Sequence, residues 1–278
     1  MSLIWLSTYN HIGDELILTA VVRDFIRRYG ERYSVGISSN HPSIWLNNPY
    51  IVRTELLHKS RTIFIRYAGD QHNASCGSCI DGFMLTLEQH LGIKIPVTEH
   101  KVDLYLSEAE QNSINPYGKY ILLNAGFINK VPTKAYNHYQ EVVDQCSDIT
   151  FVQVGGRHDC HTPLHGNNVI NLVGKTSVRE LILLMYHAVG SLSPVSNEVH
   201  LASAWNKPSV VIAGGREPYA LTGYANSSYL SSIGQYDCCT HQGCFKFTGC
   251  PYKKNGIYSK CMDEIEPEIV AKMIRKIW

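Results

Sequence analysis

The chain has 278 residues, a hydrophobic fraction of 44%, a charged fraction of 18% and a formal net charge of +1 at pH 7. This length suits one large α/β unit or two Rossmann-like halves, and the composition is that of an ordinary globular protein. The near-zero net charge argues against a strong field that would attract nucleic acid or an anionic membrane, although it leaves room for a local basic groove.

Two further features bear on where the chain is expected to fold. No apolar run approaches the roughly 18–20 residues that span a bilayer, so we expect no membrane span. The segment 1–10 has no basic region and no small-residue cleavage site, so we expect a cytoplasmic protein. Nine cysteines in that compartment are more typical of thiols or metal ligands than of a disulfide framework.

The first half of the chain alternates strand and helix patterns. Apolar runs predict strands at 3–6, 34–38, 62–67 and 103–106. Two helices are predicted between them, because apolar residues recur at helical spacing on one face: Leu18, Val21, Val22, Phe25 and Tyr29 in the first, and Ile80, Phe83, Met84, Leu87 and Leu91, followed by Gly92, in the second. The polar segment 107–118, which contains Asn115-Pro116, is predicted to be the linker to a second half.

A second alternating series follows the linker. Short apolar runs at 120–123, 150–154, 169–172 and 209–213 suit a buried parallel sheet. Ser177 and Glu180 form a capping box that begins a helix between two of these runs. The segment 267–278 starts with proline and has apolar residues at helical spacing, so a C-terminal helix is predicted there.

This organisation predicts an α/β protein with two doubly wound, Rossmann-like domains facing a cleft. We place the N-terminal domain at 1–106. The C-terminal domain is placed at 119–265, and the helix at 266–278 is expected to pack back toward the N-terminal domain. Ligands of such folds bind outside the carboxyl ends of the strands, so the loops there are the candidate site.

The first strand-to-helix turn carries two acidic residues at a helix N-terminus. Asp14 is the candidate general base that would deprotonate an acceptor hydroxyl. The alternative is that Asp14 only complements the helix dipole. His11 and His72 fall in loops expected near the cleft and are candidate substrate contacts.

A turn at 194–200 in the second half leads into another helix. Ser196 or Asn197 would cap this helix, whose free backbone N–H groups could hold a pyrophosphate, although an ordinary capped helix is the more common finding. Gly214 and Gly215 let the backbone approach a ligand closely, and Arg216 could pair with a phosphate. The alternative there is a plain turn with a solvated arginine.

Five cysteines lie within 24 residues near the C-terminus, among glycines and few apolar runs. Four thiolates held by short loops suit a tetrahedral zinc or iron site, so a structural metal is predicted. The ligands we assign are Cys239, Cys244, Cys250 and Cys261, which leaves Cys238 over; reduced, unligated thiols are the alternative. Cys76 and Cys79 form a Cys-x-x-Cys pair, for which packing is a simpler explanation than redox chemistry.

Taken together, these segments resemble glycosyltransferase family 9, the ADP-heptose:lipopolysaccharide heptosyltransferases. The resemblance covers most of the chain and is carried by IGDELILT at 12–19, NNPY at 47–50, NLVGKTS at 171–177, HLASA at 200–204 and the following KP at 207–208. Within the family, the chain is most similar to heptosyltransferase-like proteins with an AGGREP loop, here 213–218, and a CC…GC tail, here 238–244.

The resemblance implies a GT-B fold and a metal-independent, inverting transfer. It assigns Asp14 as the catalytic base, Lys134 to the donor phosphate and Asp159 to the donor ribose. Ser196, Asn197 and His200 match the phosphate-binding turn of the family. The chain departs from the family pattern at Val195, where an aspartate is usual, and in a shorter first half; these differences concern the donor contacts and the acceptor.

Three interpretations follow. The first is a glycosyltransferase that moves a heptose-like or other sugar from a nucleotide-diphosphate sugar to an acceptor hydroxyl on a glycan, a protein or modified DNA. The second is a phage-type enzyme acting on hydroxymethylated DNA bases, for which Arg53, Lys59, Arg61 and Arg66 are candidate groove residues, although such a cluster is often a solvated face. The third is a non-catalytic nucleotide-sugar-binding module. No catalytic metal is expected, and an oligomer is compatible with the sequence.

Overall fold

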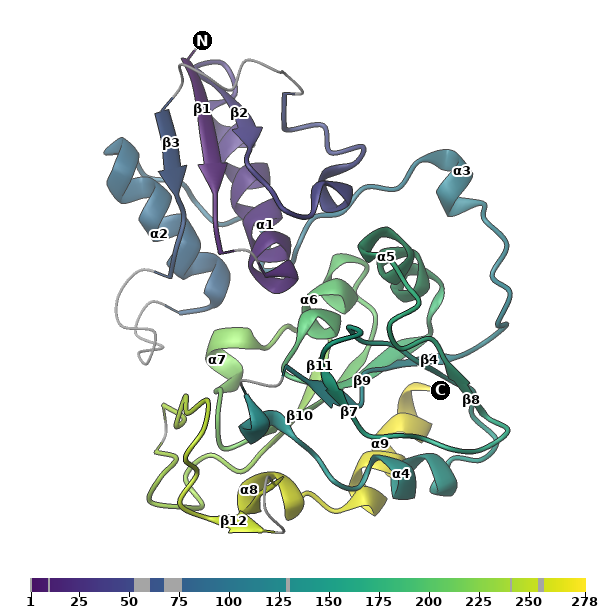
Figure 1. The fold of residues 1–278 in the computed structure, drawn as a ribbon. Helices are drawn as coiled ribbons and strands as arrows, with labels where there is room; N and C mark the ends of the chain where they lie inside the picture. Colours follow the sequence, from purple (N-terminus) through teal and green to yellow (C-terminus); the bar gives the residue numbers. More distant parts are fainter. Residues whose placement is uncertain are drawn as a thin grey trace. The chain divides into compact units, whose positions relative to one another are not determined.

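The computed structural model describes residues 2–9, 11–52, 61–67, 77–128, 131–240, 242–254 and 258–278, without the side chains of residues 61 and 254. The chain divides into two compact units, Met1–Ser113 and Ile114–Trp278. Each unit is built on a parallel sheet with helices packed against it (Figure 1). Among the helices of the described residues, none is long and apolar enough to cross a membrane.

The first unit contains a three-stranded parallel sheet in the order β2-β1-β3. Its strands are β1 (Ser2–Ser7), β2 (Tyr33–Ile37) and β3 (Arg61–Phe64), so the first three sequence-predicted strands are confirmed with shifts at their ends. β1 is central and pairs with both neighbours, so all three carboxyl ends open onto the same edge of the sheet. That edge is where a ligand of a parallel sheet is expected.

Three helices accompany this sheet. They are α1 (Ile12–Tyr29), α2 (Cys79–Leu91) and the short α3 (Glu108–Gln111). α2 starts with a capping box between Ser78 and Asp81 and ends at Gly92, which takes the left-handed conformation with φ of 66°. Glycine adopts this conformation without a Cβ clash, so the predicted helix end is confirmed. α1 and α2 pack on each other.

Residues 103–106 do not form the strand that the sequence predicts. Within the part of the chain that the structure describes, these residues join no strand; the Asp103 N–H donates to the Thr19 hydroxyl of α1 at 2.8 Å. Just upstream, the guanidinium of Arg23 donates to the carbonyl oxygens of Glu99 and Lys101, and the Asp24 carboxylate accepts from the Thr98 N–H. This segment is therefore fixed to α1, which supplies the hydrogen bonds that a sheet would otherwise provide.

The second unit contains a six-stranded sheet in the order β11-β10-β9-β4-β6-β8. Its strands, all paired in parallel, are β4 (Ile121–Leu123), β6 (Phe151–Gln153), β8 (Val169–Asn171), β9 (Gly190–Pro194), β10 (Ser209–Gly214) and β11 (Ser227–Ser231). Counted along the chain, this is the doubly wound 3-2-1-4-5-6 order, and the winding reverses between β4 and β9. The loops after β4 and β9 are therefore the expected ligand site of this unit.

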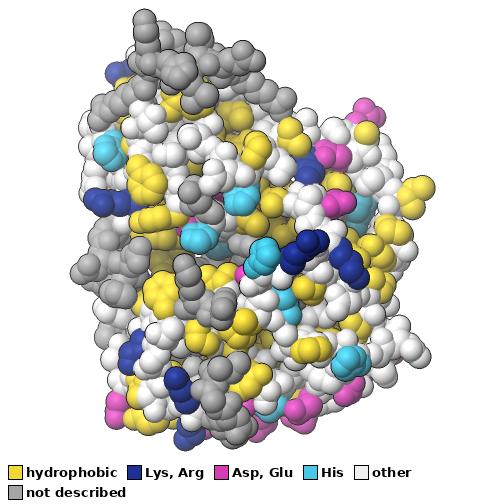
Figure 2. Space-filling model, viewed as in Figure 1, with side chains coloured by type: hydrophobic (Ala, Val, Ile, Leu, Met, Phe, Trp, Pro, Cys, Tyr) yellow, Lys and Arg dark blue, Asp and Glu magenta, His cyan; other side chains and the backbone are white. Residues whose placement is uncertain are grey.

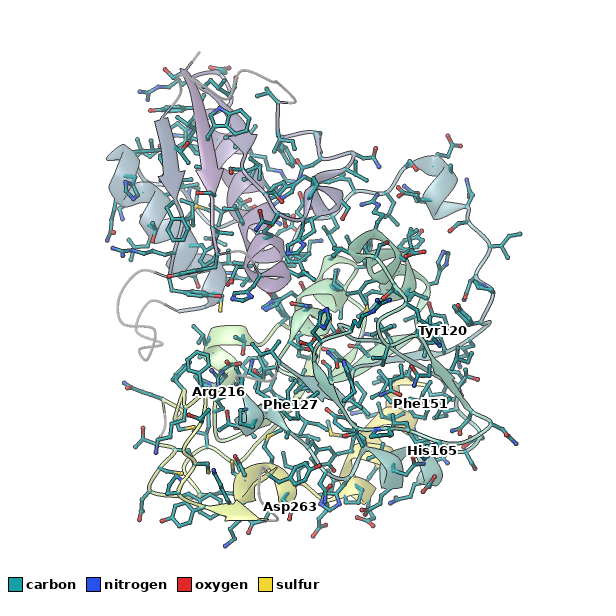
Figure 3. The ribbon with its side chains drawn as sticks, in the orientation of Figure 1. Tyr120, Phe127, Phe151, His165, Arg216 and Asp263 are labelled. Carbon is teal, nitrogen blue, oxygen red and sulfur yellow. The ribbon has the colours of Figure 1, made fainter. Side chains whose placement is uncertain are left out.

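Helices cover both faces of this sheet. On one face, α4 (Tyr139–Gln145) and α9 (Pro267–Ile277) pack on alternate strand residues such as Ile121, Leu192 and Ile212. α6 (Asn197–Ala204) packs on β9 and β10 and, in turn, on α5 (Val178–His187), which begins with the predicted Ser177–Glu180 capping box. Figure 3 labels Tyr120 and Phe151, two buried rings of this core.

β9 is a buried strand without the apolar run that predicts one. Its residues Gly190, Ser191 and Ser193 are small, and all five strand residues are buried. Side chains alternate along a strand, so Leu192 faces the α4–α9 core while the two serines face the opposite side, where α6 packs. Small side chains let the helix approach the sheet closely. At Gly190, an added Cβ would come within 2.5 Å of the Pro208 carbonyl oxygen.

The remaining short elements lie in loops of the second unit. They are β5 (Gly126–Phe127) paired with β7 (Cys160–His161), β12 (Lys253–Lys254) paired with β13 (Tyr258–Ser259), α7 (Tyr219–Thr222) and α8 (Lys260–Asp263).

The C-terminal helix α9 belongs to the second unit, where the sequence led us to expect packing toward the first domain. Its buried residues Val270, Ala271 and Ile274 lie against α4 and β10. Lys119, at the start of the unit, donates to the backbone carbonyl of Trp278 at 2.6 Å and lies over its ring. The buried part of the apolar face that periodicity identified thus packs within its own unit, whereas Ile269 is exposed.

Candidate active site

Asp14 lies in the first turn of α1, at the carboxyl edge of the first sheet, and is half-buried. Tyr67, three residues after the end of β3, donates its hydroxyl to Asp14 Oδ1 at 2.6 Å. The Tyr67 ring packs on Phe83 of α2, with the centroids 4.7 Å apart, which fixes the direction of the hydroxyl. The structure therefore gives Asp14 a partly open carboxylate held by a neighbour that sequence reasoning missed.

The second acidic residue of this turn has a structural role. Glu15 is only 3% exposed, and its carboxylate accepts hydrogen bonds from the Ser39 hydroxyl, the Asn40 N–H and the Trp45 indole N–H. These donors belong to the loop that follows β2. Glu15 thus organises the edge of the site, whereas Asp14 is only half-buried; burial separates two residues that the sequence alone left equivalent.

The other predicted residues of the first unit are less well connected. His11 is exposed at the N-cap of α1 and its side chain does not cap the helix. Arg66 is exposed beside Tyr67. His72, Arg53 and Lys59, the side chain of Arg61, and Cys76 lie outside the described residues. On the face drawn in Figure 2, the Lys and Arg side chains of the described residues are scattered among other types.

In the second unit, the switch point of the sheet holds a buried carboxylate. Glu198, in the first turn of α6, is 1% exposed and accepts from Asn124 Nδ2 at 3.0 Å and from the Ser196 hydroxyl. Asn124 directly follows β4 and Ser196 directly follows Val195, so this network joins the two loops where the winding reverses. Ser196 is the N-cap residue by position, but its hydroxyl is engaged by Glu198 instead of capping the helix.

Lys134 comes to the same place from the end of a 3-10 helix, Pro132–Lys134. Its ammonium donates to the Val195 carbonyl oxygen at 2.7 Å and lies 3.3 Å from the Glu217 carboxylate. Lys134, which the family resemblance assigns to the donor phosphate, therefore lies at the turn that the resemblance matches to the phosphate-binding turn. Its charge is already paired, so an incoming anion would have to compete with Glu217.

His200 is a buried, neutral histidine behind this turn. Its ring is 7% exposed and shares a hydrogen bond of 2.6 Å between Nδ1 and the Tyr224 hydroxyl. Burial, and secondarily the charge of Lys134, lower the pKa of His200 to about 4. The imidazole is thus uncharged at neutral pH and adds no positive charge for a phosphate; its observed contact fixes α6 to the loop before β11.

Gly215 and Arg216 follow β10, and the cysteine segment wraps around them. The Gly215 carbonyl oxygen accepts from the Cys244 N–H at 3.0 Å, and a Cβ at Gly215 would lie 2.7 Å from the Cys239 sulfur, so glycine is required there. Arg216 (labelled in Figure 3) is 6% exposed; it donates to the Lys246 carbonyl oxygen, pairs with Glu217 and lies over the Phe247 ring. Burial lowers the pKa of Arg216 to about 10, which leaves it charged at neutral pH.

The two other predicted donor contacts, Asn197 and Asp159, are half-buried. Asn197 is half-buried as the first residue of α6. Asp159 is half-buried in a turn after β6, where its N–H donates to the Gly156 carbonyl oxygen at 3.2 Å. Neither contact identifies a ligand by itself.

The predicted metal ligands gather around Gly215 without forming a closed site. The sulfurs of Cys239 and Cys261 both face this glycine, and the neighbouring thiols Cys239, Cys250 and Cys244 are among the causes, after burial, that raise the pKa of Cys238 to about 11. Among the described side chains, however, no three His, Cys, Asp or Glu groups are arranged to hold a metal ion. In their present side-chain conformations, the described thiols therefore do not form a set of metal ligands.

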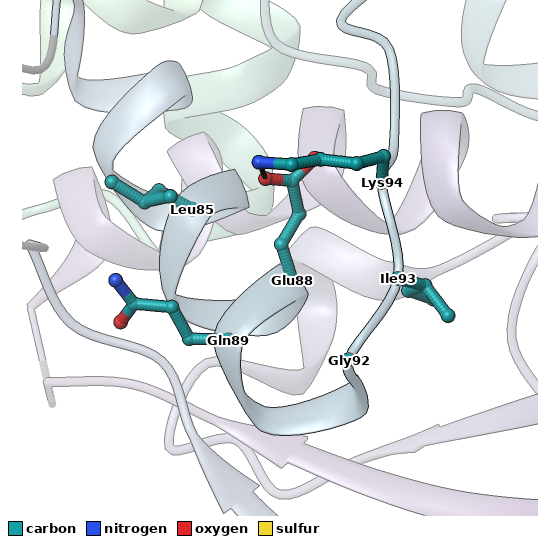
Figure 4. A pocket seen from close by; sticks show the side chains of 6 residues that line it. All are labelled: Leu85, Glu88, Gln89, Gly92, Ile93 and Lys94. Atoms are coloured by element: carbon teal, nitrogen blue, oxygen red, sulfur yellow. Dashed lines mark hydrogen bonds and ion pairs between the residues drawn. The ribbon is translucent and has the colours of Figure 1, made fainter.

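A shallow hollow of about 310 Å³ lies at the carboxyl end of α2 (Figure 4). It is lined by Leu85, Glu88, Gln89, Gly92, Ile93 and Lys94. Lys94 pairs with Glu88 at 2.8 Å, and Glu88 also accepts from the Ile95 N–H. These contacts satisfy the polar groups of the hollow as parts of an ordinary helix end, so we assign the hollow no chemistry.

Each unit therefore has one cluster of candidate residues. The first presents Asp14 with Tyr67; the second brings Lys134, Val195, Ser196 and His200 together at the switch point. Sequence reasoning missed Tyr67, Asn124, Glu198, Glu217 and Tyr224. For Asn124 and Glu217 a signal existed, because both lie just beyond the carboxyl ends of buried strands.

By sequence, the chain matches no family model and none of the curated proteins. By structure, it is similar along its length to ADP-heptose lipopolysaccharide heptosyltransferase II of E. coli, with a TM-score of 0.69, 13% identity, and 100% and 98% of the two chains covered. A family 9 glycosyl transferase from Veillonella parvula gives a TM-score of 0.70 and 14% identity, covering 99% of this chain and 97% of that one.

A third similar structure is the iron-containing dodecameric glycosyltransferase TibC from enterotoxigenic E. coli. It gives a TM-score of 0.68 and 17% identity, covering 100% of this chain and 77% of that one. The chain therefore has the α/β fold of the family 9 heptosyltransferases, the GT-B fold of two Rossmann-like units, as the sequence resemblance predicted.

Proposed function

We propose that this protein is an inverting glycosyltransferase that moves a heptose-like or other sugar from a nucleotide-diphosphate sugar to an acceptor hydroxyl. The observation that carries the proposal is the fold, which matches over both units a protein described as a heptosyltransferase and another described as a family 9 glycosyl transferase. The two clusters would supply the chemistry that such a transfer needs: Asp14 would be a base for the acceptor, and the groups around Lys134 would interact with the leaving diphosphate.

On the acceptor side, Asp14 would accept the proton of the attacking hydroxyl. The carboxylate is partly open to solvent, and the Tyr67 hydroxyl holds it in one orientation. A base must be held near the proton that it removes, so this hydrogen bond supports the assignment. Inversion requires one displacement, and a single carboxylate is enough for it.

On the donor side, the leaving diphosphate would interact with Lys134 and the free N–H groups at the start of α6. Lys134 is held at the Val195 turn through a 2.7 Å hydrogen bond to the backbone, which positions its charge beside that helix N-terminus. In binding, the diphosphate would take over the interaction that Glu217 makes with Lys134. The proposed chemistry uses no catalytic metal, because these groups stabilise the leaving charge.

We further propose that the cysteine segment holds a structural zinc or iron, with Cys239, Cys244, Cys250 and Cys261 as ligands. The approach of the Cys239 and Cys261 sulfurs to Gly215 supports the proposal, and the fold is similar to that of a protein described as iron-containing. Metal binding would require the thiol side chains to turn from their present arrangement. No step of the transfer depends on this group.

Nucleotide binding tests the donor half. ADP, UDP or GDP at a hundredfold excess over Kd should raise the melting temperature by about 5 °C or more. Lys134→Ala should reduce this shift, whereas Lys272→Ala, which removes an exposed lysine of α9, should leave it unchanged. No shift with any of the three nucleotides would contradict the proposal.

The stereochemical course tests the reaction. NMR of sugar-nucleotide hydrolysis should show, before mutarotation, a free sugar of configuration opposite to that of the donor. Retention would contradict the inverting mechanism.

The alternative is a non-catalytic module that binds a nucleotide sugar. Two observations favour it: Val195 offers no carboxylate, and Glu217 already pairs with Lys134 and Arg216. Nucleotide binding with no hydrolysis of any donor and no transfer would favour that module.

A further inference from the structure

Three aromatic rings gather at the carboxyl edge of the first sheet. Tyr9 lies just beyond β1, Phe64 is the last residue of β3, and Tyr67 follows it. The Tyr9 and Phe64 rings meet edge to face with centroids 5.2 Å apart, and the Tyr9 and Tyr67 rings are nearly parallel, with centroids 6.3 Å apart and an angle of 20°. We call these three residues the aromatic platform. The mechanism above uses only one hydroxyl from it.

The platform is not part of the hydrophobic core. Phe64 is 45% exposed, whereas its strand neighbours Ile63 and Ile65 are 1% and 0% exposed. Side chains alternate along the chain here, so Phe64 points away from the core that the two isoleucines build. The backbone beneath is fixed, because the Thr8 hydroxyl donates to the Ile65 carbonyl oxygen at 2.9 Å. The Phe64 ring is therefore exposed on a fixed backbone, beside two half-buried tyrosine rings, where a ligand could rest on it.

The platform meets the proposed base at a single residue. Tyr67 contributes its ring to the platform and its hydroxyl to Asp14 Oδ1, at 2.6 Å. A ligand that rests on the rings therefore lies beside the carboxylate. Ligand sites commonly combine an apolar, aromatic surface with a few polar groups that fix orientation, and this edge has both.

We propose that Tyr9, Phe64 and Tyr67 form the acceptor subsite, and that its ligand is a carbohydrate ring. The electropositive C–H face of a sugar packs against the electron-rich face of an aromatic ring, and a hydroxyl at the rim of that sugar would reach Asp14. This inference rests on the proposed function. A nucleic-acid acceptor is disfavoured because its phosphates need a basic surface, and the chain has a net charge of only +1.

Saturation-transfer NMR on the full chain tests the subsite without knowledge of the natural acceptor. The probes are the methyl α- and β-pyranosides of glucose, galactose and mannose, with adenosine and thymidine as the competing class. Phe64→Ala and Phe64→Leu remove the ring, and Phe64→Tyr restores it. Tyr219→Ala is the matched control, because Tyr219 is 48% exposed and its ring also meets a tyrosine ring edge to face, at 87°.

At least one glycoside should bind saturably. Its affinity should fall about tenfold in Phe64→Ala and Phe64→Leu, return in Phe64→Tyr, and stay unchanged in Tyr219→Ala. Binding of no glycoside, binding that does not depend on Phe64, or occupation of the platform by the nucleosides instead would each overturn the subsite. Circular dichroism of every variant identifies those that are folded, and the comparison is made among these.

Melting-temperature shifts with ADP, UDP and GDP on the same samples separate the two proposals. If a nucleotide binds and the glycosides do not, the acceptor subsite is wrong and the transferase proposal stands. If the glycosides bind through Phe64 and no nucleotide binds, the transferase proposal fails, and the assignment of the platform as an acceptor site fails with it.

Discussion

His200 makes the second unit sensitive to acid in a way that can be calculated. An unperturbed histidine has a pKa of about 6.5, and burial lowers the pKa of His200 to about 4 in the folded chain. Between these two values the unfolded chain binds a proton that the folded chain does not. Stability is therefore complete above about pH 6.5 and is lost as the pH falls toward 4.

The size of this effect follows from linkage. At pH 4.5 the unfolded imidazole is almost fully protonated and the folded one is mostly neutral, which costs about 2 kcal/mol of unfolding free energy relative to pH 7. The side chain is only 7% exposed, so solvent screening reduces this value little. His200→Gln removes the titrating group and keeps an amide that can bond to Tyr224, so it should lack this contribution.

Urea unfolding of both proteins at pH 7.0 and pH 4.5 measures the difference. The wild type should lose about 2 kcal/mol more than His200→Gln on acidification. His165→Gln is the control, because it removes an exposed histidine from the same unit, and its curve should run parallel to that of the wild type. Parallel curves for the wild type and His200→Gln, or an NMR titration of His200 near pH 6.5, would refute the reasoning.

Three further predictions follow from other contacts. Tyr67→Phe should lower kcat for donor hydrolysis by about 10–100-fold with KM unchanged, because it removes a hydrogen bond to a charged group. The same substitution should have no further effect in the Asp14→Ala background. An equal effect in both backgrounds would mean that Tyr67 does not act through Asp14. Arg23→Met should lower the unfolding free energy of the first unit by about 3–5 kcal/mol in urea, because it leaves Asp24 buried without its partner. Arg28→Met, on the exposed side of α1, should change the unfolding free energy little. Equal losses in the two variants would contradict this role of the Arg23–Asp24 pair. Elemental analysis should find about one zinc or iron per chain, and no metal together with full thiol reactivity in the folded state would refute the metal proposal.

Periodicity predicted most of the secondary structure because many elements have one buried side. The first three strands, the two long helices of the first unit and the C-terminal helix were all readable from apolar spacing. β9 was missed because its serines are small for close packing against α6 and carry no apolar signal. The strand predicted at 103–106 was wrong: Leu104 is buried there, but the Asp103 N–H bonds to the Thr19 side chain of α1 instead of to a neighbouring strand.

The candidate site was predicted less completely, for a physical reason. The resemblance pointed to Lys134 and the Val195 turn, and the fold places them together. Tyr67 and Glu198 matter through contacts with partners 53 and 74 residues away in sequence, and no local pattern reports such contacts. Burial, which separates Glu15 from Asp14, depends in the same way on the fold around the helix.

The most direct test of the central claim is the release of nucleoside diphosphate from a panel of ADP-, UDP- and GDP-sugars by the wild type and by Asp14→Asn. With Asp14 as the base, the variant should lose at least about a hundredfold in rate and bind the nucleotide with an unchanged Kd. Equal release by the two proteins would show that Asp14 is not the base, and no release by either in the presence of candidate acceptors would contradict the transferase assignment itself.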